Sequence, residues 1–215
     1  LFEEGAPLAE TWTTVTALAA VTSRVRFLVA VRPGFISTGL FAQMAATLDR
    51  ISGGRLDINV VPGGIQGDFE RLGEVSGHAH RYERAEEFID ACRELWKTPE
   101  PVFFEGDHIK LSGALCSPGP VADGPDFYTG GASERALDLA GRRADVYLAW
   151  ILPQDKTAQH LERARARFEA EGRSPSFGLR THLIVRDTEA EAWSAADDLL
   201  SRADSVVRGQ RAAVF

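Results

Sequence analysis

The sequence lacks several features that would assign it to other classes of protein. Its 215 residues contain two cysteines, Cys92 and Cys116, whose separation matches no metal-ligand spacing such as C-x-x-C. We expect both to be free thiols, because disulfides are rare in reducing compartments. No apolar run approaches the roughly 20 residues that span a bilayer. The acidic start Leu1-Phe2-Glu3-Glu4 is typical of neither a signal peptide nor a transit peptide, so we expect a cytoplasmic protein without a membrane segment.

An excess of positive charge is also absent. The formal net charge is −7 and the pI is near 5.3, which leaves no general basic surface for nucleic acid or an anionic membrane. Small molecules are therefore the expected ligands. Hydrophobic residues make up 44% and charged residues 26%, as in ordinary globular proteins. Since low-complexity tracts, repeats and linkers are missing, we predict one domain over residues 1–215.

Strand-like and helix-like segments alternate along the chain. Short apolar runs predict strands, and apolar residues at helical spacing predict helices. The predicted strands are residues 27–31, 56–61, 127–129, 146–149 and 177–185, and the predicted helices are residues 11–22, 38–51, 81–96, 133–143, 153–172 and 189–202. Residues 102–111 predict an antiparallel hairpin around Glu105-Gly106-Asp107. The alternation predicts an α/β protein with βαβ units and a parallel sheet.

The number of predicted strands leaves two architectures open. A closed (β/α)₈ barrel needs eight parallel strands, whereas an open doubly wound sheet needs no more than are visible. No G-x-G-x-x-G follows any predicted strand, which disfavours the dinucleotide-binding version of the open sheet. Gly130-Gly131-Ala132-Ser133 instead predicts a tight turn that leads into a helix N-terminus.

Seven segments, in order and spacing, resemble flavin-dependent alkanesulfonate monooxygenases of the bacterial-luciferase-like superfamily. They are R-F-L-V-A-V-R-P-G-F-I-S, A-A-T-L-D-R-I-S-G-G-R, I-N-V-V-P-G-G, R-Y-E-R-A-E-E-F, F-Y-T-G-G-A-S, D-V-Y-L-A-W and F-G-L-R-T-H-L-I-V-R-D-T. The resemblance covers residues 7–200, approximately, and implies a (β/α)₈ TIM barrel of which this chain holds the third to seventh strands, with the hairpin as an insertion. It also implies that strands one, two and eight and a mobile lid lie outside this sequence.

The resemblance implies a monooxygenase that uses reduced FMN and O₂ to cleave the carbon–sulfur bond of an alkanesulfonate or related sulfone. It further implies a separate NAD(P)H-dependent flavin reductase as partner and a homodimer or homotetramer. Three alternatives keep the same fold. They are a reduced-flavin enzyme that degrades a heterocycle or a flavin itself, a deazaflavin-dependent oxidoreductase, and a flavin-binding relative without catalytic activity.

Three residues are predicted to be catalytic. Arg180 and His182 are two residues apart in the predicted strand 177–185, so both face one side of its carboxyl-terminal half, where barrel active sites lie. The resemblance implies that Arg180 holds an anionic group near the flavin and that His182 transfers protons. Trp150 matches a family tryptophan beside the flavin. The alternatives are a core histidine, a structural ion pair of the arginine and core packing of the tryptophan.

Two predicted helix starts are candidates for binding the FMN phosphate, because a helix N-terminus offers unpaired amides and partial positive charge. The resemblance implies that Tyr82, Gly131 and Ser133 bind the phosphate, and Arg81 with less support. The alternative makes Ser133 an N-cap and Tyr82 an anchor of the core.

Asn59 and Gly63 end another predicted strand, where the family has a Thr-Gly-Gly loop by the flavin ring. Pro62 replaces that threonine here, which removes a hydroxyl and a backbone donor. Leu8 stands where alkanesulfonate monooxygenases carry a cysteine. His78 and His80 have no carboxylate or cysteine at a suitable spacing in sequence, so we predict a polar loop at this point and no metal site.

Overall fold

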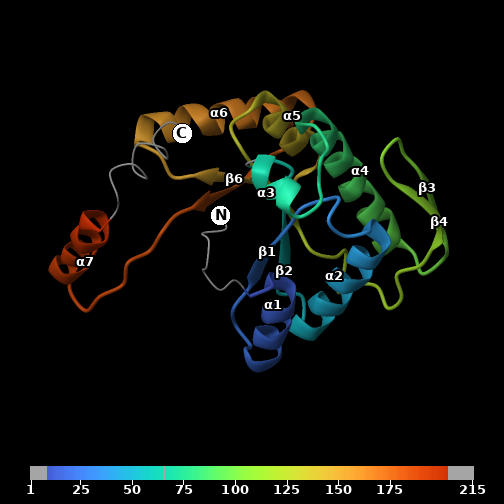
Figure 1. Cartoon of the computed structure of the whole chain (residues 1–215), viewed down its shortest axis with the longest axis horizontal. Helices are drawn as coiled ribbons and strands as arrows, with labels where there is room; N and C mark the ends of the chain where they lie inside the picture. Colours follow the sequence, from blue (N-terminus) through green and yellow to red (C-terminus); the bar gives the residue numbers. More distant parts are fainter. Residues whose placement is uncertain (1–8, 65, 203–215) are drawn as a thin grey trace. The chain divides into compact units, whose positions relative to one another are not determined.

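The computed structural model describes residues 9–64 and 66–202 of the chain, which forms two compact units (Figure 1). The first unit ends at Leu179 and the second begins at Arg180. A single barrel domain over residues 1–215 stays a prediction. The elements of the first unit, the last strand reaching one residue beyond it, are α1 (Thr11–Val21), β1 (Phe27–Val31), α2 (Thr38–Ser52), β2 (Leu56–Val60), α3 (Gln66–Arg71), α4 (His78–Lys97), β3 (Val102–Glu105), β4 (Lys110–Ala114), β5 (Phe127–Gly130), α5 (Glu134–Arg143), β6 (Val146–Trp150), α6 (Gln154–Ala170) and β7 (Ser176–Arg180).

The main sheet has five strands in the order β1-β2-β5-β6-β7. The pairs β1–β2, β2–β5 and β5–β6 are parallel, with Val29 opposite Ile58 and Ile58 opposite Phe127. Apart from the hairpin β3–β4, the strand order follows the chain order without a reversal. A doubly wound sheet would reverse direction at a switch point. The sheet is therefore an arc of a (β/α)₈ barrel, and the predicted α/β fold is confirmed.

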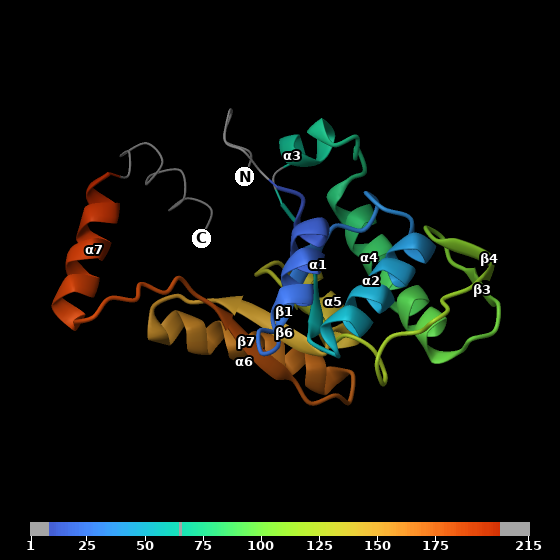
Figure 2. The same ribbon diagram turned by 90° about the horizontal axis from the view of Figure 1, so that it is seen from below.

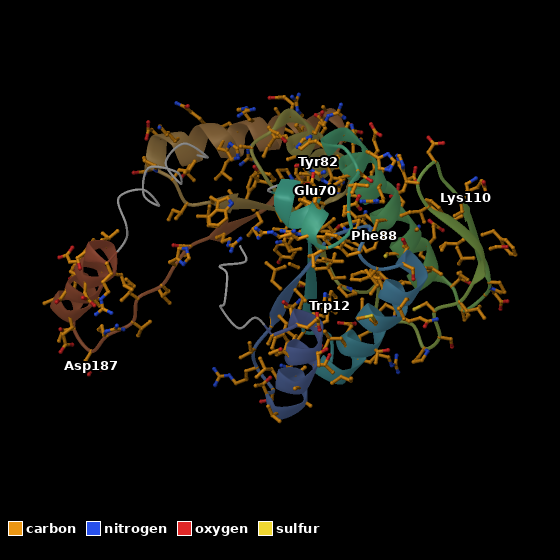
Figure 3. The ribbon with its side chains drawn as sticks, in the orientation of Figure 1. Trp12, Glu70, Tyr82, Phe88, Lys110 and Asp187 are labelled. Carbon is orange, nitrogen blue, oxygen red and sulfur yellow. The ribbon has the colours of Figure 1, made fainter. Side chains whose placement is uncertain are left out.

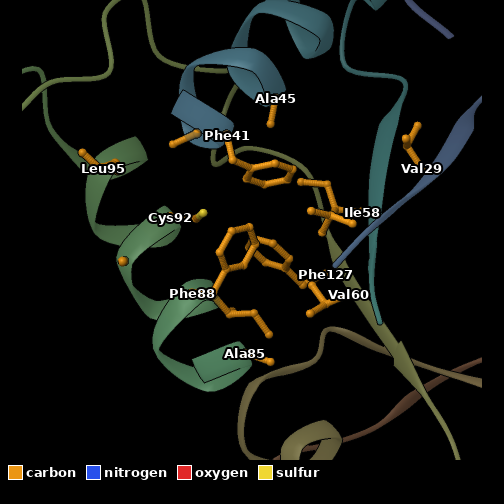
Figure 4. Packing of buried hydrophobic residues seen from close by; sticks show 14 of the residues in the cluster. Val29, Phe41, Ala45, Ile58, Val60, Ala85, Phe88, Cys92, Leu95 and Phe127 are labelled. Atoms are coloured by element: carbon orange, nitrogen blue, oxygen red, sulfur yellow. The ribbon is translucent and has the colours of Figure 1, made fainter. Parts of the chain in front are cut away.

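The helices form a layer in which each one packs against the next along the chain, α3 excepted. The contacts are α1 with α2, α2 with α4, α4 with α5 and α5 with α6. Between this helical layer and the sheet lies the core, in which Phe41 of α2, Phe88 of α4 and Phe127 of β5 meet beside Ile58 (Figure 4). The Phe41 and Phe88 ring centroids are 4.8 Å apart. In β1 the buried residues alternate with exposed Leu28 and Ala30, so the opposite face of the sheet is open in this unit.

The predicted hairpin is confirmed as β3 and β4, which pair in antiparallel fashion. Figures 1 and 2 both show it beside α4, and the contacts between α4 and β3 agree. Ile109, at the end of the hairpin turn, is buried in the core. The hairpin is thus an insertion that packs on the helical layer and leaves the main sheet unbroken.

Three segments differ from the prediction. The helix α3 was not predicted, and α4 begins at His78 instead of Arg81. The polar loop expected at His78 and His80 is therefore wrong, because the helical bonding already starts where the Arg81 amide donates to the Gly77 carbonyl over 3.1 Å. The strand expected over residues 177–185 ends at Arg180. Its neighbour in the sheet, β6, ends at Trp150.

In the second unit, residues 181–188 form neither helix nor strand, and α7 (Glu189–Ser201) follows. A capping box starts α7: the Glu191 amide donates to the Thr188 hydroxyl and the Thr188 amide donates to the Glu191 carboxylate. None of the helices in the described residues is both long enough and apolar enough to cross a bilayer.

Candidate functional site

The loops at the carboxyl ends of β2 and β5 meet at the hydroxyl of Tyr82, which lies near the start of α4 (Figure 3). A Cβ placed on Gly63 would lie 3.0 Å from Tyr82 Oη, and one placed on Gly131 would lie 3.9 Å from the same atom. Gly131 also has a φ of +122° and would bring a Cβ within 2.9 Å of the Ala136 Cβ. Only glycine fits here without strain. The structure thus brings together three of the predicted cofactor residues.

Tyr82 anchors the core, as the alternative interpretation predicts, and its binding of a phosphate stays a prediction. Its side chain is 8% exposed and belongs to the hydrophobic core, with the ring of His78 4.8 Å away between centroids. Its hydroxyl, at the edge of the core, makes no hydrogen bond to any described residue. A buried aromatic ring with its polar group at a loop edge is a common way to present a hydrogen-bond donor to a ligand.

Ser133 is the N-cap of α5, as the alternative interpretation predicts. Its Oγ accepts a hydrogen bond from the Ala136 amide at 3.3 Å, and its side chain is exposed. Glu134 in the first turn pairs with Arg163 at 2.6 Å and with Arg167, both on α6. The pairing directs the Glu134 carboxylate to α6, where two guanidinium groups neutralise it. The remaining α5 amides and the helix dipole therefore favour an anion at this end.

Arg81 supports the β2 loop. It is 3% exposed, its Nε donates to the Pro62 carbonyl at 3.0 Å, and its guanidinium lies 4.3 Å from the centroid of the Phe69 ring. Nη1 donates to the Ser76 carbonyl. These contacts fix the backbone that precedes Gly63. A direct contact between Arg81 and a phosphate stays a prediction.

Tyr147 and His160 form a hydrogen-bonded pair that fixes the loop after β5, and sequence reasoning missed both. The Tyr147 hydroxyl donates to the Gly131 carbonyl at 2.8 Å and lies 2.6 Å from His160 Nε2. Burial raises the pKa of Tyr147 to about 12, and burial together with the charge of Arg163 lowers the pKa of His160. Since the phenol proton goes to the carbonyl, a neutral His160 donates its Nε2 proton to Oη. The one available signal was a tyrosine in an otherwise apolar strand.

Asn59 and Trp150 lie on the open face of the sheet. Leu56, Ile58 and Val60 point into the helical core, so the alternating Asn59 points the other way. Trp150 ends β6 and is 38% exposed, on the side opposite Tyr147 and Ala149. The alternative of core packing for Trp150 is therefore not what the structure shows. Contact of either residue with a flavin stays a prediction.

Arg180 and His182 belong to the second unit. Arg180 is the last residue of β7, and His182 lies in the irregular segment after it, exposed to solvent. The argument that strand alternation turns both side chains to one side is wrong, because the strand does not reach His182. The alternative of a buried core histidine is also excluded. Their catalytic roles stay predictions, and Leu8 lies outside the described residues.

His80 has a carboxylate neighbour after all, three residues along α4. The imidazoles of His80 and His108 and the carboxylate of Glu83 place their ligand atoms within 4.8 Å of one another. Sequence reasoning missed this group because His108 comes from the hairpin, 28 residues from His80.

The glycine loops, the helix N-terminus and the tyrosine hydroxyl lie at the carboxyl edge of a barrel arc, which is the edge where barrel enzymes bind their substrates. The chain matches the family of luciferase-like monooxygenases over residues 2–214. The protein is therefore a member of the luciferase-like monooxygenase family. The predicted superfamily is confirmed, while a special closeness to alkanesulfonate monooxygenases is not.

Solved structures agree on the fold. A riboflavin lyase, crystallised with modified FMN and riboflavin, superposes with a TM-score of 0.80 at 22% identity over 91% of this chain and 49% of its own. A long-chain alkane monooxygenase gives 0.79 at 21% identity, covering 89% of this chain and 50% of its own. DmoA from Hyphomicrobium sulfonivorans gives 0.77 at 23% identity, covering 92% and 48%. The chain thus spans about half the length of these proteins.

Proposed function

We propose that this chain supplies the FMN-binding strand ends of a monooxygenase that uses reduced FMN and O₂ to oxidise a small organic substrate. The reaction proposed is carbon–sulfur cleavage of an alkanesulfonate or related sulfone. One observation carries the proposal: Tyr82 Oη faces the glycine backbones that follow β2 and β5. Membership of the luciferase-like monooxygenase family supports it.

The residues at this edge fit an FMN phosphate. The Tyr82 hydroxyl is a donor without a protein partner in the described residues, and Gly131 leaves its backbone accessible because it has no Cβ. Ser133 opens α5, whose N-terminal amides and dipole favour a doubly charged phosphate. Tyr147 and Arg81 keep the two loops in place through the Gly131 and Pro62 carbonyls. Bound reduced FMN supplies the electrons that activate O₂.

The other residues act on the substrate side in this proposal. Asn59 contacts the flavin ring from β2, and Trp150 packs against the ring or the substrate from the end of β6. Arg180 binds the anionic group of the substrate through charge-assisted hydrogen bonds, and His182 transfers protons near neutral pH. The exposure of His182 leaves its imidazole accessible to such a substrate.

Partners and location belong to the same proposal. In this proposal reduced FMN comes from a separate NAD(P)H-dependent flavin reductase. The protein acts in the cytoplasm as a homodimer or homotetramer. A chain with a net charge of −7 repels nucleic acid, so small organic molecules are the better match as substrates.

The first experiment tests phosphate binding. Charge-assisted hydrogen bonds contribute about 1.5–3 kcal/mol, so FMN should bind about 10–100-fold more tightly than riboflavin, which lacks the phosphate. In Gly131→Ala this preference should fall at least about tenfold, because a Cβ at φ +122° displaces the loop. Gly172→Ala is the matched control, since Gly172 also has a positive φ, +67°, but nothing lies within 4 Å of its Cβ position. Equal affinities of the unaltered protein for FMN and riboflavin would contradict the proposal.

The second experiment tests the reaction. With photochemically reduced FMN and an alkanesulfonate, the protein should consume O₂ and release sulfite, and His182→Ala should lower turnover at least about tenfold if the imidazole transfers protons. Consumption of riboflavin instead of sulfonate would favour the flavin-degrading alternative. The similarity in fold to a riboflavin lyase is the reason for including this substrate. Reduction by a deazaflavin without O₂ uptake would favour the oxidoreductase alternative. Flavin binding without any turnover would favour the non-catalytic relative.

A further inference from the structure

Three side chains of α4 and the hairpin come together on the surface of the first unit, in the part of α4 that also carries Arg81 and Tyr82. His80 and Glu83 are three residues apart on α4, which puts them on one face of the helix. His108 reaches this face from the turn between β3 and β4. Its Nε2 lies 3.5 Å from Glu83 Oε2, and its ring centroid lies 4.3 Å from that of His80.

The hairpin turn is fixed on α4 by a second carboxylate, one helical turn further along. Glu87 accepts hydrogen bonds from the amides of Asp107, His108 and Ile109 at 2.9, 2.9 and 2.8 Å. Gly106 makes this approach possible, because a Cβ there would collide with the Glu87 carboxylate. The backbone of His108 is therefore held in place before any ligand binds, and its side chain is only 13% exposed.

We propose that His80, Glu83 and His108 bind a divalent transition-metal ion, with Zn²⁺ as the best match. Two imidazoles and one carboxylate form a typical zinc ligand set, and a fourth position is left for water or an exogenous ligand. Neighbouring ligand atoms around tetrahedral zinc lie roughly 3.4 Å apart. The 3.5 Å between His108 and Glu83 already fits, and rotation of the exposed His80 closes the remaining distance from at most 4.8 Å.

His80 and Glu83 are exposed, so an ion bound between them and His108 can take its fourth ligand from solvent. His108 also lines a cavity of about 600 Å³ between the loop after β1 and the hairpin. The nearest competing cation is Arg135, whose Nη1 lies 3.8 Å from Glu83 Oε1. This long, exposed ion pair is weak and gives way to a metal ion. A bound ion would join the hairpin to α4 through side chains in addition to the Glu87 bonds.

Titration of the purified protein with Zn²⁺ in competition with a chromophoric chelator tests the site. One zinc ion should bind per chain, and Co²⁺ should give the intense visible absorption of a tetrahedral complex. His108→Ala and Glu83→Gln should each weaken zinc binding at least about tenfold, and Arg135→Ala should strengthen it by up to about fivefold. His78→Ala is the matched control, because His78 lies in the same helical turn outside the cluster, and it should keep the affinity.

Several outcomes would overturn the site. Zinc affinity that is the same in the unaltered protein, His108→Ala and Glu83→Gln would do so, as would an equal loss in His78→Ala or a six-coordinate cobalt spectrum. The thermal midpoint gives a second readout, since zinc should raise it in the unaltered protein and raise it by less in Glu83→Gln, a variant expected to fold normally. FMN affinity should be the same in His108→Ala, so failure of the flavin proposal and failure of the metal site are distinguishable.

Discussion

Replacing Tyr147 with phenylalanine removes one hydroxyl and leaves every carbon of the side chain in place. This hydroxyl donates to the Gly131 carbonyl at 2.8 Å and lies 2.6 Å from His160 Nε2, and the residue is 0% exposed. Without it, the carbonyl and the imidazole N–H lose their common partner beneath the β5 loop. Leaving buried polar groups unpaired costs about 1–3 kcal/mol of folding free energy.

Urea unfolding followed by tryptophan fluorescence measures this loss. With a slope of about 2 kcal/mol per molar urea, the midpoint of Tyr147→Phe should fall by roughly 0.5–1.5 M. Tyr128→Phe is the matched control, because Tyr128 sits on the open face of the neighbouring strand β5 and its hydroxyl bonds to no described residue. Its midpoint should stay within about 0.25 M of the unaltered protein, as for most surface changes.

The result that would refute this reasoning is an unchanged midpoint in Tyr147→Phe, or an equal fall in Tyr128→Phe. Either would mean that the hydroxyl does not hold the Gly131 loop. The unfolding slope must be the same in all three proteins, because a changed slope would indicate an altered unfolded state instead of a lost contact.

Two further predictions concern titratable groups, the half-buried His160 and the two buried cysteines. His160 has a lowered pKa in the folded protein, so the unfolded chain binds more protons below its ordinary value near 6.5; stability is full above that pH and is lost as the pH falls through the folded pKa. His160→Gln should remove this part of the pH dependence between about pH 7 and 5, and identical pH profiles of unfolding free energy would contradict it. Cys92 and Cys116 are buried free thiols whose pKa values are raised by burial, so a thiol reagent should label neither in the native protein and both in denaturant. Fast labelling of native protein would show that the core opens.

Elements with strong local patterns were predictable from the sequence. The apolar run Phe27–Val31 and the stripe of α2 gave the right types of element, because burial of one face imposes a fixed period on each. Gly131 and Ser133 were placed correctly at a loop and a helix start, since a positive φ and an N-cap each demand a particular residue type. The barrel arc followed from alternation together with family resemblance.

Ends of elements and contacts between distant residues were not predictable. Strand β7 stops at Arg180 although the apolar alternation continues beyond it, and no local pattern reports where a partner strand ends. His78 and His80 were assigned to a loop because polar residues at the start of a helix lack the apolar spacing by which a helix is recognised. The local sequence does not show which segments pack against one another. The ends of elements and the contacts between distant residues therefore become known only from the folded chain.

The amino-acid sequence by itself determined the α/β class, the order of the strands of the main sheet and of most helices, and the glycine turns at the carboxyl edge, because each shows as a pattern within a short stretch of chain. Only the tertiary structure decided that Tyr82 meets Gly63 and Gly131, that Tyr147 holds the β5 loop, and that His108 joins His80 and Glu83. These contacts link segments that are far apart in the chain, and their geometry is fixed by packing of the shared core.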